Sequence, residues 1–313
     1  MTMTDITALG EILIDLTQSG VNAKGVPEYA ANPGGAPANL AVAATRLGAK
    51  AAFVGKVGND SFGNLLKRTL SDNGVDISGL ATDDKEATTL AVVSVDESGE
   101  RSFSFYRDPS ADVNLRREDV PESLLDAKFF HFGSVSLTAD PARDTTLWAA
   151  ARAKERGAWI SYDPNYRPSL WQDQETALTR MKQPLPMVDI LKVSDEELLL
   201  LTGADDISAG AAILAAYGIS LVLVNLGAEG AFYRFSGGEG RVSGVPCVVG
   251  DTNGAGDTFL GAVLAQLAAR GGLESMEKPE LERIIAFANK AASITASRHG
   301  AIPAMPDYRE VFG

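Results

Sequence analysis

Apolar runs typical of β-strands alternate with segments of helical periodicity, and this alternation restricts the fold more than any other feature. The expected strands are residues 6–9, 51–54, 129–132, 159–162, 190–193 and 221–224, and the expected helices are residues 37–47, 62–71, 142–156, 209–217, 255–269 and 281–297. Such alternation predicts a mostly parallel sheet covered by helices, with ligands at the carboxyl ends of the strands. No linker divides the chain, so we expect a single α/β domain over residues 1–313.

A glycine-rich stretch, residues 251–259, has the features of an anion-binding helix start. It reads Asp-Thr-Asn-Gly-Ala-Gly-Asp-Thr-Phe and continues into an apolar helical segment. The amides of Gly254, Ala255 and Gly256 would point toward one spot at the positive end of the helix dipole, which suits a phosphate or a developing anion. Asp257 would lie in the first turn and could accept a proton from a substrate hydroxyl. Taken alone, such a stretch is more often a turn in which Asp257 caps the helix.

A second glycine-containing stretch lies near the other end of the chain, at residues 32–39. It reads Asn-Pro-Gly-Gly-Ala-Pro-Ala-Asn and continues into a helical pattern that Gly48 closes. Gly34 and Gly35 allow the backbone to approach a ligand closely, and Asn39 offers both a donor and an acceptor, as a sugar hydroxyl requires. The presence of both stretches favours group transfer to a polyol over two unrelated turns.

Together the two stretches resemble the two signatures of the ribokinase-like carbohydrate kinase family (PfkB type), and bacterial fructokinases are its most similar members. The likeness extends over essentially the whole chain. It implies a ribokinase-like three-layer α/β fold, ATP and Mg²⁺ as cofactors, and transfer of the γ-phosphoryl group to a sugar hydroxyl. In this scheme Asp257 is the base, and the amides of residues 254–256 stabilise the transferring group.

One segment interrupts the alternation of strands and helices. Residues 88–95 and 101–106 are rich in β-forming residues, and residues 96–100 between them read as a hairpin turn. With residues 12–16 and the stretch around Tyr29 they could form a small separate sheet, although an edge hairpin is the simpler alternative. In the resembled family such a sheet, here near residues 12–32 and 86–110, is a lid over the sugar and often the surface of a homodimer.

Five further polar residues are candidates for contact with the acceptor or with the nucleotide's phosphate. Asp15 ends a strand, and its carboxylate can accept two hydrogen bonds from polyol hydroxyls. Tyr106 and Arg107 end the hairpin, and Arg107 would direct a cation toward the substrate unless it is an ordinary surface arginine. Arg167 follows another strand and can neutralise charge on a transferring phosphoryl group. The resemblance assigns nearby Asn165 to the phosphate.

The resemblance also assigns residues to the nucleotide and its ions. The family usually has an asparagine where this chain has Ser194, and three residues later a glutamate that organises water around Mg²⁺. Glu197 is therefore the expected magnesium residue, whereas Ser194 lacks the amide found there in the family. Asp251 corresponds to an acid of a monovalent cation site, so K⁺ is a further candidate. The other expected nucleotide residues are Lys192, Asn225 (where Thr is common), Gly227, Gly230, Gly256 and Asn289.

Several function classes are excluded by what the sequence lacks. No GxxxxGK(S/T), HRD or DFG string occurs, so P-loop and protein-kinase chemistries are not expected. Phe259 stands where a dinucleotide fingerprint requires Gly or Ala. His131 and His299 have no metal-ligand spacing and read as structural. The formal net charge of −13 disfavours nucleic acid and anionic membrane as partners.

Cysteine content and the start of the chain indicate a cytoplasmic protein. Cys247 is the only cysteine, so no internal disulfide can form, and it reads as a small apolar residue in a reducing compartment. Residues 1–15 lack a targeting pattern, and no run reaches the ~18 apolar residues of a membrane span.

The expected activity is that of an ATP-dependent sugar kinase. Fructose is the first candidate acceptor, because residues 130–134 and residues 32–39 both resemble fructokinases. The runner-up is 2-keto-3-deoxygluconate, whose carboxylate Tyr106, Arg107 and Arg167 could bind. Ribose or a nucleoside comes third. A non-catalytic sugar-binding regulator on the same fold is the alternative outside enzymes, and the presence of Asp257 argues against it.

Overall fold

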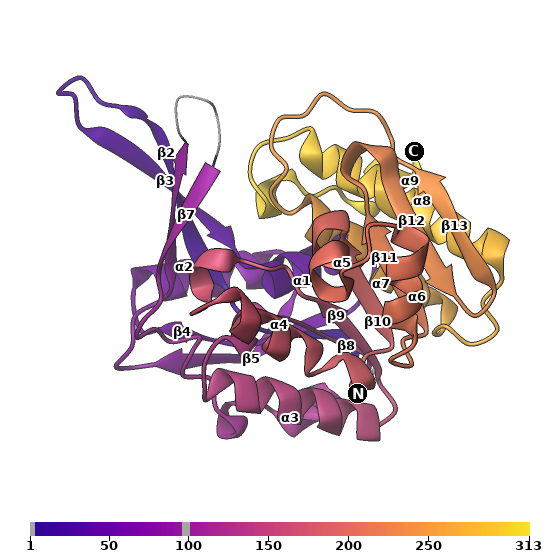
Figure 1. Ribbon diagram of the computed structural model, residues 1–313. Helices are drawn as coiled ribbons and strands as arrows, with labels where there is room; N and C mark the ends of the chain where they lie inside the picture. The colour runs from indigo at the N-terminus through magenta and orange to yellow at the C-terminus, as the bar shows by residue number, and fades with distance from the viewer. Residues whose placement is uncertain (1–3, 96–100) are drawn as a thin grey trace.

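The computed structural model describes residues 4–95 and 101–313, and a nine-stranded sheet lies at its centre (Figure 1). The strands are β1 (Thr4–Leu9), β4 (Ala51–Gly58), β5 (Asp76–Asp83), β8 (Ala127–Gly133), β9 (Trp159–Asp163), β10 (Ile190–Ser194), β11 (Leu221–Asn225), β12 (Gly230–Phe235) and β13 (Gly238–Ser243). Their order is β13-β12-β11-β10-β9-β8-β1-β4-β5. The strands from β11 to β5 run parallel, and β12 and β13 extend one edge as an antiparallel hairpin.

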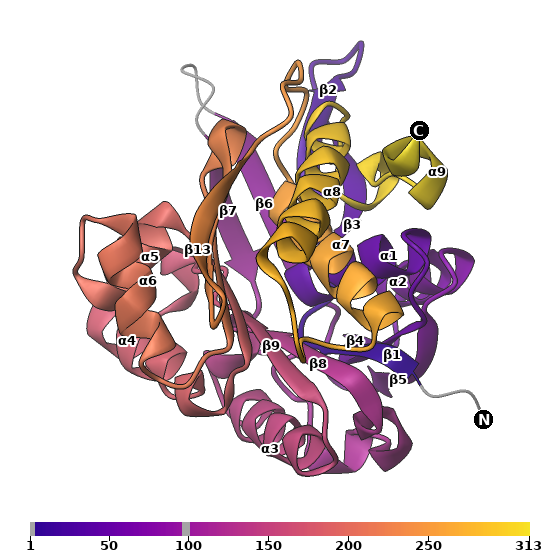
Figure 2. The same cartoon turned by 90° about the vertical axis from the view of Figure 1, so that its right-hand side faces the viewer.

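Helices cover both faces of the sheet and make the molecule a three-layer structure (Figures 1 and 2). One face carries α1 (Ala36–Arg46), α2 (Ser61–Asp72), α7 (Ala255–Arg270) and α8 (Lys278–Ala296), with the short α9 (Tyr308–Phe312) against α8. The other carries α3 (Ala142–Glu155), α4 (Gln174–Lys182), α5 (Asp195–Thr202) and α6 (Ile207–Ala215). Strand residues alternate between the two cores: Phe129 packs in the first, and Phe130 and Phe132 in the second.

A smaller sheet stands away from the main one (Figure 1). It consists of β2 (Leu13–Val21), β3 (Pro27–Gly34), β6 (Leu90–Val95) and β7 (Arg101–Tyr106), in the order β3-β2-β6-β7. The expected hairpin pairing is present, because Leu90 of β6 lies opposite Tyr106 of β7 in an antiparallel ladder. The predicted turn at residues 96–100 lies outside the described residues. We call these four strands the small sheet.

The arrangement confirms the predicted fold class. Each of the six expected strands and six expected helices is present, with ends that differ by up to three or four residues. The carboxyl ends of the parallel strands meet along one edge of the main sheet, beneath the small sheet (Figure 1). Within the described ranges, no single helix is long and apolar enough to cross a membrane; the bent pair formed by α5 and α6 meets that test jointly, by length and composition alone.

Candidate active site

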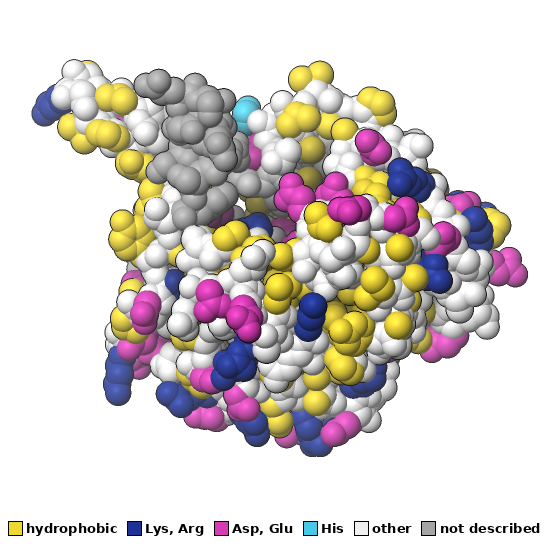
Figure 3. Space-filling view, in the orientation of Figure 1, with side chains coloured by type: hydrophobic (Ala, Val, Ile, Leu, Met, Phe, Trp, Pro, Cys, Tyr) yellow, Lys and Arg dark blue, Asp and Glu magenta, His cyan; other side chains and the backbone are white. Residues whose placement is uncertain are grey.

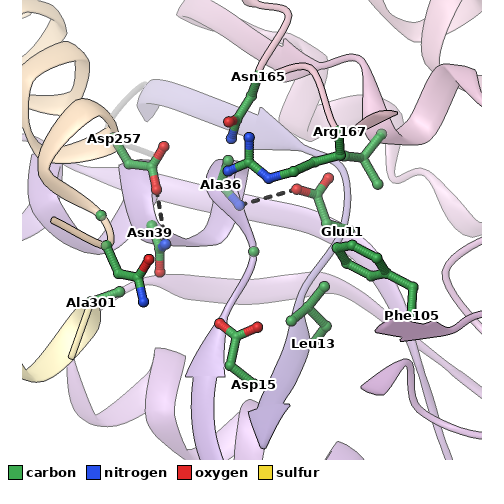
Figure 4. A pocket seen from close by; sticks show the side chains of 14 residues that line it. Glu11, Leu13, Asp15, Ala36, Asn39, Phe105, Asn165, Arg167, Asp257 and Ala301 are labelled. Atoms are coloured by element: carbon green, nitrogen blue, oxygen red, sulfur yellow. Dashed lines mark hydrogen bonds between the residues drawn. The ribbon is translucent and has the colours of Figure 1, made fainter. Parts of the chain in front are cut away.

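A pocket beneath the small sheet gathers residues from both ends of the chain (Figure 4). The surface is visibly hollowed between the small sheet and the body of the molecule (Figure 3). We call this cavity the acceptor pocket. Seven of its lining residues were expected from the sequence: Asp15, Gly35, Asn39, Asn165, Arg167, Gly254 and Asp257. The sequence interpretation missed Glu11, Leu13, Ala36, Phe105, Val135, Asn253 and Ala301. Asn165, which was assigned to the nucleotide, lies in this pocket.

Asp257 occupies the first turn of α7, directly after the glycine turn. Gly254 is the N-cap of that helix and adopts φ 75°, which favours glycine. A Cβ atom there would lie 2.9 Å from the Cβ of Ala301. Asn39 of α1 donates a hydrogen bond from Nδ2 to Asp257 Oδ2 at 2.8 Å, so the two signature stretches meet directly.

Burial gives Asp257 the electrostatics of a base. Removal from water raises the pKa of Asp257 to about 6, the Asn39 hydrogen bond lowers it in part, and the Asp163 carboxylate raises it further. The cations Lys192 and Arg167 act in the lowering direction. At neutral pH the carboxylate is therefore ionised yet more basic than an ordinary aspartate, as proton acceptance requires.

The glycine pair at the end of β3 holds the opposite wall of the acceptor pocket. Gly35 adopts φ 108°, and a Cβ atom there would lie 2.5 Å from the Glu11 carbonyl oxygen. A Cβ atom on Gly34 would overlap Asp15 Oδ2. Burial raises the pKa of Asp15 to about 6, an effect that Arg167 opposes. Glycine at position 34 therefore leaves the space that the Asp15 carboxylate occupies at the pocket wall.

A second cavity, with a volume of about 500 Å³, opens on the other side of the glycine turn. We call it the nucleotide cleft. Five residues expected to contact the nucleotide line it: Asn225, Gly227, Gly230, Gly256 and Asn289. Asn289 donates from Nδ2 to the carbonyl oxygens of Val242 and Ser243, each at 3.1 Å, and so joins α8 to β13. Cys247, expected from the sequence to be a small apolar residue, also lines the cleft and is exposed.

The glycine turn separates the two cavities. Gly254 and Asp257 line the acceptor pocket, while Ala255 and Gly256 line the nucleotide cleft. The amides of one helix start therefore lie between a space for the acceptor and a space for the donor. Charge that develops on a group passing across this turn would meet the positive end of the α7 dipole.

Lys192 lies buried beside the same turn. Its Nζ contacts Asp163 Oδ2 at 2.8 Å, and a Cβ atom on Gly256 would lie 3.1 Å from that Nζ. Burial acts to lower the pKa of Lys192, but the carboxylates of Asp163 and Glu197 outweigh it and leave the pKa raised. The site therefore contains a permanent cation next to the anion-binding amides.

Ser194 and Glu197 form a capping box at the start of α5. Glu197 accepts hydrogen bonds from the amides of Ser194, at 2.8 Å, and Tyr166, at 2.7 Å, on different oxygens. Neither residue lines the two cavities. Each Glu197 oxygen keeps a second lone pair, which fits contact with a metal through water. Among the described residues, no group of three or more His, Cys, Asp or Glu side chains could hold a metal ion directly.

Asp251 joins the two loops at the carboxyl end of the chain. It accepts from the amide of Asn253 at 3.0 Å and from the amide of Gly300 at 3.2 Å. The loops that the resemblance assigns to a monovalent cation are therefore held together by this carboxylate.

Two residues expected to bind the sugar lie elsewhere. Tyr106 is 66% exposed, because strand alternation in β7 directs Phe105 and not Tyr106 to the acceptor pocket. Arg107 is buried but does not line the pocket: it donates to Asp112 Oδ2 at 2.7 Å, to Thr138 Oγ1 at 2.6 Å and to the Val135 carbonyl at 3.0 Å. Its guanidinium is thus used within the protein.

Comparison with known proteins agrees with this geometry. The family profile described as pfkB family carbohydrate kinase matches residues 3–308. The probable fructokinase-4 of Arabidopsis thaliana is 42% identical over 311 residues, which span 98% of this chain and 95% of that protein. The crystal structure of the Xylella fastidiosa fructokinase with bound ATP has a TM-score of 0.92 at 34% identity and covers 98% of this chain and 97% of its own. The crystal structure of a fructokinase double mutant from Vibrio cholerae O395, with bound fructose, ADP and potassium ion, has a TM-score of 0.89 at 34% identity. The match covers 99% of this chain and 98% of that chain. This chain therefore belongs to the pfkB family of carbohydrate kinases, phosphotransferases that act on a sugar hydroxyl.

Proposed function

We propose that this protein transfers the γ-phosphoryl group of ATP to fructose and forms fructose 6-phosphate. The observation that carries the proposal is the glycine turn, whose consecutive residues border both the acceptor pocket and the nucleotide cleft. A sugar in the first cavity and ATP in the second would meet at the amides of Gly254 to Gly256. Similarity to fructokinases over nearly the whole chain supports fructose as the acceptor.

The residues around the turn supply what an in-line transfer needs. Asp257 accepts the proton of the attacking hydroxyl, and the Asn39 amide keeps that carboxylate oriented. The turn amides and the Lys192 cation stabilise charge on the transferring group, and Arg167 adds a second cation among the residues that line the acceptor pocket. Catalysis then depends mainly on positioning and electrostatics.

The charges in the acceptor pocket favour a neutral sugar over a sugar acid. Glu11, Asp15 and Asp257 line the pocket, and Arg167 is the one basic side chain among the lining residues. Arg107, which would have bound the carboxylate of 2-keto-3-deoxygluconate, is paired with Asp112. An acidic acceptor would therefore face three acidic side chains with one arginine to balance their charge.

We also propose Mg²⁺ and a monovalent cation as cofactors. Glu197 would orient water around Mg²⁺ through the lone pairs that its backbone partners leave unused, and the ion would neutralise charge on the phosphates. Asp251 would border a K⁺ site, a proposal supported by the potassium ion bound to the similar V. cholerae protein.

The small sheet fits the role of a lid that also joins two copies of this chain. Its strands and the turn between β2 and β3 expose Val21, Val26, Tyr29 and Tyr106, at 57%, 53%, 49% and 66%. Such apolar exposure on a projecting sheet favours burial against the same sheet of a second copy. Light scattering after size-exclusion chromatography should give the mass of a dimer. The mass of a monomer at every protein concentration would contradict the proposal that the small sheet joins two copies.

A coupled assay of ADP release tests the proposed function. Fructose, 2-keto-3-deoxygluconate, ribose, glucose and adenosine are compared as acceptors with ATP as donor. We expect fructose to give the highest specificity constant. A higher value for 2-keto-3-deoxygluconate would overturn the choice of fructose, and ADP release with none of the five would favour a non-catalytic binding protein.

A further inference from the structure

Glu11 is a buried acid in the acceptor pocket that the mechanism above leaves unused. It follows β1 and is 4% exposed. Its Oε1 accepts a hydrogen bond from the Ala36 amide at 3.0 Å, whereas its Oε2 is buried and has no hydrogen-bond partner among the described residues. Figure 4 shows the carboxyl group among the side chains of the pocket, with its one bond directed to Ala36.

A buried carboxylate oxygen without a donor is costly, and folded proteins rarely retain one without a reason. Asn39 Oδ1 is a second buried acceptor with no hydrogen-bond partner among the described residues, and Asn39 lines the same pocket. Two residues that line the pocket thus each hold a buried acceptor for which the described part of the chain supplies no donor. Sugar hydroxyls are donors of the required kind.

The surroundings keep the Glu11 carboxyl in place. The backbone at residues 11–12 packs directly against Gly35, and the Ala36 amide binds Oε1 from the start of α1. Burial raises the pKa of Glu11 to about 7; its own backbone amide, Arg107 and the Ala36 amide oppose this shift, and Asp112 adds to it. Arg107 is itself bound to Asp112, so it leaves Glu11 Oε2 without a direct partner.

We propose that Glu11 is a sugar-contacting and specificity-determining residue, whose Oε2 accepts a hydrogen bond from one hydroxyl of the acceptor and whose charge disfavours acidic acceptors. The proposal rests on the sugar kinase function proposed above. It gives Glu11 two tasks in one side chain, because Oε1 positions the loop before α1 while Oε2 binds the substrate.

The test compares Glu11→Gln with the wild type at alkaline pH, where the Glu11 carboxyl is ionised. Glutamine can still accept from the Ala36 amide but presents an NH₂ donor in place of Oε2. We expect the KM for fructose and its calorimetric Kd to rise about tenfold to hundredfold, with little change in the KM for ATP. The melting temperature should not fall, because the buried Glu11 charge that the substitution removes destabilises the folded wild type at this pH. Glu282→Gln is the matched control: Glu282 accepts from the Tyr233 hydroxyl outside both cavities, and its variant should bind fructose normally.

Monodeoxy analogues of fructose separate a sugar contact from a structural role. The penalty of Glu11→Gln should vanish for the one analogue that lacks the hydroxyl bound by Oε2. An unchanged fructose KM, or an equal penalty for every analogue, would overturn the proposal. If Glu11→Gln does not fold, Glu11→Asp serves instead, because it withdraws the acceptor while it keeps the charge.

The identity of the best acceptor is read from the wild type alone. If that sugar is not fructose, the proposal of fructose as the acceptor fails. The comparison of Glu11→Gln with the wild type can then be made with the sugar that the wild type prefers. The two proposals therefore fail by different results.

Discussion

Asp257 and Asn39 lie 218 positions apart in the sequence and share a hydrogen bond in the active site. The Asn39 amide nitrogen donates to Asp257, the proposed base, while the buried Asn39 Oδ1 has no partner within the described chain, and Asn39 lines the acceptor pocket. One side chain can therefore orient the base and the sugar toward each other. The arrangement carries a cost, because Asp257 is held as an anion in a poorly hydrated position.

This cost predicts that Asp257→Asn is more stable than the wild type at neutral pH. The folded-state pKa of Asp257, about 6, exceeds the ordinary value of 3.8, so ionisation destabilises the folded state above about 6 and ceases to do so as the pH falls toward 3.8. Since the side chain keeps some solvent contact, we expect a gain of about 1–2 kcal/mol in the free energy of unfolding. Urea titration at neutral and acidic pH measures it; a gain that is absent at neutral pH, or that grows toward acid, would contradict the account.

At the scale of single residues, the sequence predicts side chains within the signatures better than those outside them. Asp257, Asn39 and Gly35 were expected and line the acceptor pocket. Glu11 was missed because its partner is a backbone amide 25 positions away, for which no side-chain pattern exists. Phe105 was missed because the packing of the small sheet over the pocket determines which side chains of β7 point into the pocket, and the sequence does not specify that packing.

Among the elements, β7 is anchored to the body of the molecule by Arg107. The guanidinium joins the end of the strand to Asp112, Thr138 and the Val135 carbonyl. Arg107→Gln leaves the buried Asp112 carboxylate without its cation, so we expect a loss of about 3 kcal/mol in the free energy of unfolding. The KM for fructose should change little, because Arg107 does not line the acceptor pocket.

The double variant Arg107→Gln/Asp112→Asn is the control for this interpretation. It removes the uncompensated charge, so it should regain part of the lost stability in the same urea titration. Unchanged stability together with a strongly raised KM would instead make Arg107 a substrate contact.

At the scale of the whole molecule, the alternation of strands and helices predicted the parallel part of the sheet except for β5, which no expected strand covers. The antiparallel edge was not expected, because β13 begins within the glycine-rich residues 236–240 and its exposed side chains show no apolar alternation. The two cavities were predicted only as a region at the carboxyl ends of the strands. Their separation by the glycine turn depends on the packing of α7 against α1 and α8, which periodicity does not specify.

The raised pKa values of the buried carboxyl groups in the acceptor pocket predict how activity depends on pH. Asp257 acts as a base only when ionised, and burial raises the pKa of both Asp257 and Asp15 to about 6. The specificity constant for fructose at saturating ATP should therefore be high above about 7 and fall as the pH decreases through about 6. Circular dichroism at each pH verifies that the protein stays folded. A profile that is flat down to the ordinary carboxyl pKa of 3.8 would conflict with this picture.

The central claim, that Asp257 at the glycine turn accepts the proton of a sugar hydroxyl as ATP phosphorylates it, is tested most directly by the turnover of Asp257→Asn. Asparagine keeps the shape and the acceptor for Asn39 but removes the base. We predict that kcat falls by about 10²–10⁴ while calorimetric binding of fructose and ATP changes little. A near-normal kcat in a variant that binds both substrates would contradict the assignment.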